Sequence, residues 1–369
     1  MKKLGFGTMR LPLIPGGKQT DIDQEQVNRM ADYFLANGFT YVDTAYMYHD
    51  YMSERAVKKA FVDRHPRDSF ALADKLPAAM VKTAEDYPRL FAEQAEKCGV
   101  EYFDYYLLHD ITRLNLDTVE KTDGFGFMKK LKAEGKAKVI GFSYHDKAEL
   151  LDKILAAHPE MEFVQLQINY VDWEDAAIQS RLCYEVCRRH GKQVMVMEPV
   201  KGGALAKIPE NAQAILKARD EKMSIASWAV RYAASLDDVA IVLSGMSNMQ
   251  QMEDNVSYMK DFVPLKKDDL AAIDEVVKIV RSSIAVPCTG CRYCVNHAPG
   301  CPMNIAIPEY FALYNNVHQY GVSWSTIQGF RSLKLEYGVP ADCIECGQCE
   351  EHCPQHIDII KRLKEVPVN

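Results

Sequence analysis

Two runs of closely spaced cysteines stand near the C-terminal end of this sequence and hold eight of its eleven cysteines. The later run, CIECGQCEEHCP (residues 343–354), has the spacing C-x2-C-x2-C-x3-C followed by proline. The earlier run, CTGCRYCVNHAPGCP (288–302), repeats this spacing with a longer last gap. Zinc sites need only four ligands, usually from two separated C-x2-C pairs. The third cysteine in register in each run therefore favours iron–sulfur clusters over zinc.

The later run matches the spacing of bacterial ferredoxins, so the sequence predicts two [4Fe-4S] clusters. In two-cluster ferredoxins the fourth cysteine of each run binds the other cluster. By that rule one cluster takes Cys288, Cys291, Cys294 and Cys353, and the other takes Cys343, Cys346, Cys349 and Cys301. We expect the three remaining cysteines to be core-facing or idle thiols rather than ligands: Cys98, Cys183 and Cys187.

Short apolar segments alternate with longer amphipathic ones through the first 280 residues. Eight of them read as strands, from KLGFGTMRLP and TYVDTA to QVMVMEPV and VAIVLSGM. They are apolar nearly throughout, as expected of strands that are covered on both faces. Eight strand–helix units suit a (β/α)8 TIM barrel. The competing doubly wound sheet would usually carry an early G-x-G-x-x-G turn, which this sequence lacks.

The uneven distribution of cysteines predicts a second, smaller domain after the barrel. We place the barrel at residues 1–284 and a ferredoxin-like iron–sulfur domain at 285–369. About 40 residues separate the two cysteine runs, and IPEYFALYNNVHQYG and STIQGFRSLKLEYG within them predict two helices. The predicted fold is therefore α/β, a TIM barrel followed by a small C-terminal domain with an α-helical insert.

Six polar residues lie at or near the C-terminal ends of the predicted strands: Asp43, Lys75, His109, Ser143, Gln165 and Glu198. A strand end tolerates a polar residue for structural reasons alone. Six of them on successive strands are better explained by an active site, because that face of a barrel carries the active site.

The order of these marks resembles the aldo-keto reductase superfamily over roughly residues 4 to 260. They are the opening GFGTMRLP, then D-T-A-x-x-Y, then a lysine, L-L-H and G-F-S at the ends of the third, fourth and fifth strands. The resemblance implies an oxidoreductase in which Tyr48 is the general acid, supported by Asp43, Lys75 and His109.

The chemistry of these residue types agrees with that implication. Reduction of a carbonyl by a nicotinamide hydride leaves an alkoxide that needs a proton, and a free tyrosine has a pKa of about 10. The ammonium of Lys75 beside Tyr48 is expected to lower that pKa, and Asp43 is expected to hold Lys75 charged and oriented. His109 can orient the substrate oxygen or relay the proton.

The same resemblance implies a nicotinamide site, NADP(H) or NAD(H), although its residues match less well. Tyr144 replaces the usual asparagine, and Met197 stands near the position of the usual stacking aromatic residue. These departures leave a flavin in the barrel mouth as an alternative. The expected cofactor contacts are Thr8, Met9, Ser143, Gln165, Glu198, Pro199, Lys201, Gly202, Gly245, Ser247, Gln251 and Asn255.

Composition limits the partners. The net charge is −7 and the sequence pI about 5.9, which argues against nucleic acid as a default partner. No apolar run approaches the roughly 18–20 residues of a membrane helix, and the N-terminus lacks an apolar signal core. We therefore expect a cytoplasmic protein.

The barrel followed by eight cysteines resembles the group of aldo-keto reductases with a fused ferredoxin-type domain. The leading hypothesis is an oxidoreductase that acts on a small carbonyl or alcohol, with the clusters serving electron transfer or structure. A nicotinamide moves two electrons as hydride, whereas each cluster accepts one. The alternatives are therefore a flavin-using reductase, or an electron-transfer protein on a catalytically altered barrel. A ferredoxin or other redox protein is a candidate partner.

Overall fold

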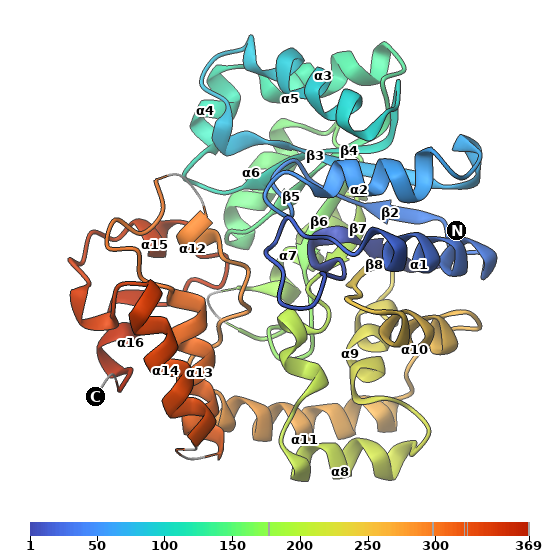
Figure 1. Cartoon of the computed structure of the whole chain (residues 1–369). Coiled ribbons are helices and arrows are strands. Elements are labelled where there is room, and N and C mark those ends of the chain that lie inside the picture. The colour runs from blue at the N-terminus through green and yellow to red at the C-terminus, as the bar shows by residue number, and fades with distance from the viewer. Residues whose placement is uncertain (176–177, 297–298, 321, 323, 368–369) are drawn as a thin grey trace. The chain divides into compact units, whose positions relative to one another are not determined.

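The barrel predicted from the sequence is present. The computed structural model describes all residues except 176–177, 297–298, 321, 323 and 368–369. Parallel strands close into a barrel in sequence order, and the first pairs with the eighth (Figure 1). The strands are β1 (Leu4–Gly7), β2 (Tyr41–Asp43), β3 (Ala71–Pro77), β4 (Phe103–Ile111), β5 (Ala137–Tyr144), β6 (Phe163–Gln167), β7 (Gln193–Met197) and β8 (Val239–Gly245). The doubly wound alternative is therefore wrong.

Helices follow the strands, as the alternating sequence pattern predicted. They are α1 (Gln24–Ala36), α2 (Ser53–Val57), α3 (Asp86–Cys98), α4 (Leu116–Lys121), α5 (Gly124–Ala133), α6 (Ala148–Ala157), α7 (Ser180–Arg189), α9 (Ile225–Ala234) and α10 (Met249–Met259). After β2, helix α2 continues directly into a π-helical turn, Lys58–Val62. Within the described part of the chain, no helix has the length and apolar character needed to cross a membrane.

Large side chains fill the inside of the barrel. The buried cluster there consists of Tyr41, Ala73, Leu107, Phe163, Met195, Ile241 and Leu243. Gly5 on β1 leaves room for them: a Cβ added there would lie 2.8 Å from the side chains of Ile241 and Leu243. The barrel is thus a packed core, and polar groups can gather only at its ends.

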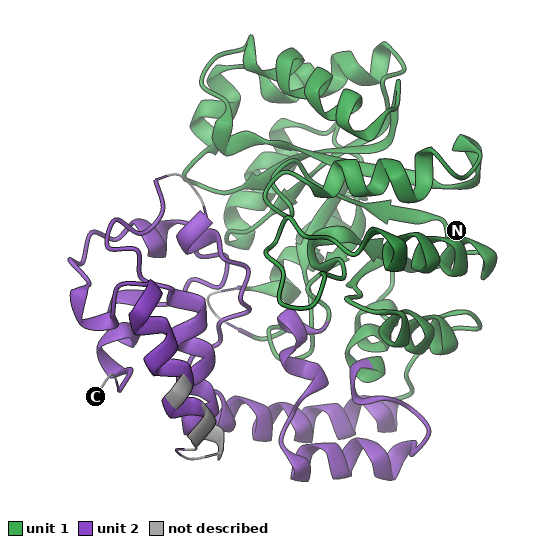
Figure 2. Ribbon diagram, in the orientation of Figure 1, with its two compact units in different colours: residues 1–174, 179–199, 227–266 green, residues 175–178, 200–226, 267–369 purple. Residues whose placement is uncertain are grey.

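The chain divides into two compact units (Figure 2). We call residues 1–174, 179–199 and 227–266 the barrel unit, and residues 175–178, 200–226 and 267–369 the C-terminal unit. This division differs from the predicted boundary at 284/285, because α8 (Glu210–Arg219) packs against α11 (Lys267–Ser283). An ion pair of 3.0 Å between Arg219 and Asp269 joins those two helices.

The C-terminal unit has its own apolar core, in which cysteines of both runs take part. Its further helices are α12 (Tyr293–Asn296), α13 (Ile307–Tyr320), α14 (Trp324–Glu336), α15 (Gln348–Glu351) and α16 (Ile359–Glu365). The two helices predicted between the cysteine runs are therefore confirmed as α13 and α14. Buried residues of this core include Cys294, Ile305, Tyr310, Phe311, Cys349, Cys353 and Ile359.

Candidate active site and cysteine centre

A buried lysine is the centre of the polar group at the strand ends of the barrel unit. Lys75 lies on β3, and its side chain is 0% exposed. Its Nζ forms an ion pair with Asp43 at the end of β2. The same Nζ donates to the carbonyl oxygen of Thr44 at 2.8 Å and to the phenol oxygen of Tyr48 at 3.3 Å. The ammonium therefore connects two of the predicted catalytic residues directly.

Asp43 is held in place by partners other than Lys75. Gln165 Nε2 on β6 donates to the second carboxylate oxygen at 3.1 Å. The hydroxyl of Thr8, which follows β1, donates to the carbonyl oxygen of Asp43 at 2.9 Å. A second hydroxyl, that of Ser53, lies 2.8 Å from that of Thr8. The bond from Gln165 orients the carboxylate, and the bonds of Thr8 and Ser53 hold the backbone that carries it.

The pKa values of the phenol and the ammonium are both shifted upward. Burial lowers the pKa of Lys75, but Asp43 and Tyr48 raise it by more, so Lys75 keeps its charge. Burial raises the pKa of Tyr48, while Lys75 lowers it. The sequence predicted the lowering by Lys75 but not the net direction, because the depth of burial was not visible in the sequence. Tyr48 therefore holds its proton at neutral pH.

His109 completes the group of predicted catalytic residues. It lies near the end of β4 and is 3% exposed. Its ring meets the ring of Tyr48 edge-on, with centroids 5.9 Å apart and an interplanar angle of 84°. The structure thus gathers Asp43, Tyr48, Lys75 and His109 at one end of the barrel, and their catalytic roles stay predictions.

Several predicted cofactor residues lie at the ends of barrel strands. Ser143 on β5 and Gln165 on β6 are partners in the strand register, and each is 1% exposed. The hydroxyl of Ser143 accepts the backbone N–H of Asp110 at 2.8 Å. Thr8 is buried and Met9 half-buried on the short helical turn after β1. Ser143 and Gln165 therefore form an adjacent hydroxyl and amide at the same barrel end.

The predicted residues after β7 divide between the two units. Glu198 is half-buried, with a φ of 54°, and Pro199 is buried; both belong to the barrel unit. Lys201 and Gly202 belong to the C-terminal unit. The Nζ of Lys201 donates to Oε1 of Gln355 at 2.8 Å within that unit. Contact of Lys201 with a phosphate stays a prediction.

The predicted residues after β8 form a hydrogen-bonded turn. Gly245 is exposed at the end of β8, and the backbone N–H of Ser247 donates to Oε1 of Gln251 at 2.7 Å. Asn255 on α10 is buried and donates to the hydroxyl of Ser244 at 2.6 Å. Asn255 therefore ties α10 to the end of β8, and its contact with a nucleotide stays a prediction.

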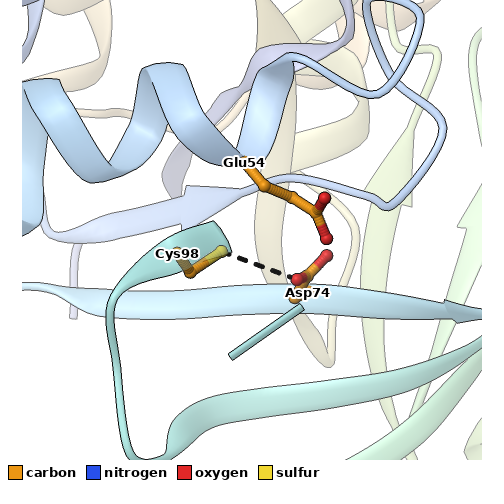
Figure 3. A group of neighbouring side chains, drawn as sticks. All are labelled: Glu54, Asp74 and Cys98. Atoms are coloured by element: carbon orange, nitrogen blue, oxygen red, sulfur yellow. Dashed lines mark hydrogen bonds between the residues drawn. The ribbon is translucent and has the colours of Figure 1, made fainter. Parts of the chain in front are cut away.

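Sequence reasoning missed a buried group of two carboxyls and a thiol behind Lys75. Glu54 on α2, Asp74 on β3 and Cys98 on α3 point toward one another, with their ligand atoms all within 4.8 Å (Figure 3). Asp74 accepts the backbone N–H of Lys75 at 2.8 Å. Burial raises the pKa of Glu54 to about 7, opposed by Lys97 at 3.1 Å. The sequence feature that could have revealed this group is the pair of neighbouring charged residues, Asp74 and Lys75, within one strand.

The two cysteine runs share left-handed backbone positions on both sides of their second cysteine. Gly290 and Glu345, one residue before the second cysteine of each run, have φ values of 65° and 57°. Arg292 and Gly347, one residue after it, have φ values of 67° and 82°. In the first run, the N–H of Gly290 donates to the sulfur of Cys288 at 3.4 Å. These left-handed positions turn the backbone sharply on both sides of the second cysteine of each run.

Cysteines of the two runs lie close to one another. Four of them line one cavity of about 330 Å³, part of which is open to solvent: Cys301, Cys343, Cys346 and Cys349. Burial raises the pKa of Cys349 to about 12, with Glu350, Cys343, Cys301 and Cys346 adding to the rise. Burial also raises the pKa of Cys294, with Cys291, Cys288, Cys353 and Cys349 adding to the rise. The last cysteine of each run thus lies close to cysteines of the other run, and the assignment of each cysteine to one cluster stays a prediction.

The three remaining cysteines lie in the barrel unit and are buried, as expected. Cys98 lies within hydrogen-bonding reach of Asp74 at 3.7 Å, and Cys183 within reach of the carbonyl oxygen of Asp146 at 3.6 Å. Burial raises the pKa of Cys187 well above the usual thiol range. None of these environments favours a thiolate.

Comparison with protein families divides the chain in the same way as its motifs. The model of the aldo/keto reductase family matches residues 3–278. The model described as a 4Fe-4S dicluster domain matches residues 287–357, which include both cysteine runs.

Relatives and solved structures resemble the barrel portion. A protein named probable aldo-keto reductase 1, from Glycine max, is 26% identical over 76% of this chain and 86% of its own length. L-galactose dehydrogenase of Arabidopsis thaliana is 24% identical over 76% of this chain and 91% of its own. The holo form of an aldo-keto reductase from Bacillus halodurans has a TM-score of 0.61 and 23% identity, over 74% of this chain and 91% of its own. An aldo-keto reductase from Klebsiella pneumoniae in complex with NADPH has a TM-score of 0.59 and 21% identity, over 74% and 90%.

Proposed function

Because this chain belongs to the aldo/keto reductase family and is an oxidoreductase, we propose that its barrel reduces a small carbonyl compound with a nicotinamide hydride, or oxidises the alcohol in reverse. The contact of buried Lys75 with both Asp43 and Tyr48 carries this proposal. The pair Ser143 and Gln165 supports a nicotinamide, because a hydroxyl and an amide offer the donor and acceptor groups that a carboxamide needs.

The residues of this chain supply the proton of the reaction. A nicotinamide, when bound, supplies the hydride to the carbonyl carbon. Tyr48 donates its proton to the carbonyl oxygen, since burial keeps the phenol protonated and an alkoxide is a much stronger base than a phenolate. The ammonium of Lys75 then stabilises the phenolate that remains, and Asp43 keeps that ammonium charged and in place. His109, edge-on to Tyr48, orients the substrate oxygen.

The C-terminal unit is proposed to bind two [4Fe-4S] clusters. The first set, Cys288, Cys291, Cys294 and Cys353, would hold one cluster, and the second set, Cys301, Cys343, Cys346 and Cys349, the other. The cysteine-lined cavity and the N–H donated to the Cys288 sulfur support the fit, because such bonds stabilise cluster thiolates. A bound cluster supplies one-electron redox chemistry, which the hydride reaction of the barrel does not use.

Two alternatives account for the one-electron clusters differently. A flavin in the barrel would exchange both hydride and single electrons. If the barrel has lost its catalytic activity and the protein only transfers electrons, the barrel would need neither a nicotinamide nor a flavin. The Asp43–Lys75–Tyr48 arrangement argues against such a loss of activity. Burying an ion pair has a desolvation cost, and a barrel with a purely structural role can avoid it.

The test begins with the full chain purified without oxygen. We expect iron and sulfide in equal amounts, no zinc, and binding of NADPH or NADH measured by fluorescence. Oxidation of the bound coenzyme is then followed with small aldehydes, ketones and aldoses. Aldoses are included because one relative is named L-galactose dehydrogenase. Tightly bound flavin would support the flavin alternative instead.

Tyr48→Phe tests the proton donor. It should lower turnover about 10²–10⁴-fold, the usual contribution of a general acid, while leaving coenzyme affinity unchanged. Tyr51→Phe is the matched control, because Tyr51 is 48% exposed and lies three residues away in the same segment. Equal turnover of the two variants on any substrate that the wild type reduces would refute the role of Tyr48.

A further inference from the structure

Lys201 lies beside the first set of cysteines, at two points of contact within the C-terminal unit. It is 3% exposed, and its Nζ donates to the side chain of Gln355 at 2.8 Å. Gln355 stands two residues after Cys353. The neighbouring Gly202 presses against the loop of Cys288: a Cβ at Gly202 would lie 2.3 Å from the carbonyl oxygen of Thr289. Lys201 thus sits between the two chain segments that carry the first and last members of that set.

The backbone at Lys201 is adapted to this position. Lys201 has a φ of 47°, followed by Gly202 with 65° and Gly203 with 101°. A left-handed conformation is unfavourable for a residue with a side chain and persists where the surroundings require it. Three such residues in a row turn the segment sharply. This turn brings the ammonium to Gln355 and the Cα of Gly202 to Thr289.

The second set of cysteines has a different neighbour at the matching position. Both runs end in cysteine and proline, and the chain then makes the same turn. The carbonyl oxygen of Cys301 accepts the N–H of Asn304, and that of Cys353 accepts the N–H of His356, both at 2.9 Å. The residue after C-P is Gln355 in one run and Met303 in the other. Gln355 is 5% exposed and holds an ammonium, whereas Met303 is 37% exposed and lines the cavity of the second set.

The cation near the second set differs in exposure as well. Lys364 pairs with Glu345, which lies between Cys343 and Cys346, at 2.7 Å. The two side chains are 60% and 56% exposed, so water and salt screen this pair. Lys201 is buried, where a charge acts through a medium of lower dielectric constant. Its electrostatic effect on a neighbouring group is therefore the stronger one.

We propose that Lys201 raises the reduction potential of the cluster bound by Cys288, Cys291, Cys294 and Cys353, a role that rests on the proposed presence of two clusters. Reduction adds one electron to a cluster and makes it more negative. A buried ammonium attracts the reduced form more strongly than the oxidised form, so it shifts the equilibrium toward reduction. Lys201 is thus a tuning residue that acts through space and through Gln355, without binding iron.

The test is a redox titration of the full, iron-loaded chain, followed by electron paramagnetic resonance. Lys201→Met removes the charge and keeps the length of the side chain. The equilibrium constant for reduction of one cluster should fall at least tenfold, which is about 59 mV for a one-electron couple. Lys201→Arg keeps the charge and should stay closer to the wild type. Lys207→Met is the matched control, because Lys207 is exposed just after the same helical turn.

Further variants identify the cluster and guard against loss of iron. In a Cys301→Ala background, which leaves the first set complete, the remaining cluster should show the same fall. If Lys201→Met does not retain iron, Gln355→Glu decides, because a carboxylate placed beside Lys201 should also lower the potential. Unchanged potentials in Lys201→Met, or an unchanged or raised potential in Gln355→Glu, would overturn the role of Lys201. Absence of iron from the wild type would instead refute the clusters themselves.

Discussion

Lys75→Met should destabilise the barrel strongly, because it leaves a buried carboxylate without its counter-charge. Lys75 is 0% exposed and Asp43 3% exposed in their side chains. Removing one partner of a buried ion pair costs about 3–5 kcal/mol. The bond from Gln165 to Asp43 remains in the variant, so it does not enter the difference. Met is unbranched and similar in length to Lys, which limits the loss of packing.

The double variant Asp43→Asn/Lys75→Met separates the charge from the packing. Replacing both partners of a buried ion pair by neutral groups is often nearly neutral for stability. The double variant should therefore regain most of the stability that Lys75→Met loses. Domains of 150–250 residues shift in Tm by roughly 2–4 °C per kcal/mol, so the single variant should melt roughly 6–20 °C below the wild type.

Calorimetry of the full chain at pH 8 and pH 5, at one scan rate, measures these differences. Burial raises the pKa of Asp43, and in the wild type Lys75 opposes that rise. Lys75→Met removes this opposition. A carboxyl group whose pKa in the folded state lies above its unfolded value of about 3.9 makes the protein less stable as the pH rises between those two values. The deficit of Lys75→Met should therefore be larger at pH 8. Equal Tm values for the single and double variants would show that lost packing, and not the unpaired carboxylate, causes the effect.

Two further substitutions test Glu54 and Cys301. Burial raises the pKa of Glu54 to about 7 from 4.5, so ionisation of Glu54 destabilises the folded state as pH rises through that window. Glu54→Gln should accordingly gain stability relative to the wild type between pH 5 and pH 8, by up to about 3 kcal/mol, in urea unfolding at both pH values; a constant difference would contradict the raised pKa. Cys301→Ala should lose about half of the bound iron by colorimetric assay, since one cluster lacks a ligand. Cys98→Ala, the control, should lose none, and full iron content in Cys301→Ala would show that Cys301 is no ligand.

The strand pattern and the strand-end residues were predictable because a barrel couples sequence to position closely. Strands covered on both faces must be apolar, so a polar residue at a strand end stands out. Asp43 and Lys75 were identified in this way. The contact between them needed only that neighbouring parallel strands place their ends side by side, as the pairing of β2 with β3 does.

Other features depend on how deeply a side chain is buried and which way it points, and a single sequence shows neither. Successive side chains of a strand face opposite ways, so Asp74 points away from Lys75 toward α2 and α3. Its partners Glu54 and Cys98 come from two different helices, and no local spacing links them. The net rise in the pKa of Tyr48 likewise reflects desolvation by its surroundings.

That residues 200–226 belong to the same compact unit as residues 267–369 was also not predictable from the sequence. The stretch EPVKGG has a glycine-rich composition that suits a phosphate loop as well as a tight turn. Only the structure shows the hydrogen bond from Lys201 to Gln355, two residues that are 154 positions apart.

The exchange of the last cysteine between the two runs bears on how the holoprotein matures. In the proposed ligand sets Cys353 joins the earlier run and Cys301 the later one. During translation the second set would become complete at residue 349 and the first only at residue 353, so neither set of four thiols exists until the later run has been synthesised. Insertion of iron into either set would therefore have to wait until nearly the whole chain is made, although the earlier run itself ends at residue 301. A nonsense codon at or before position 349 would leave both sets incomplete, whereas one at positions 350–353 would leave only the first set incomplete.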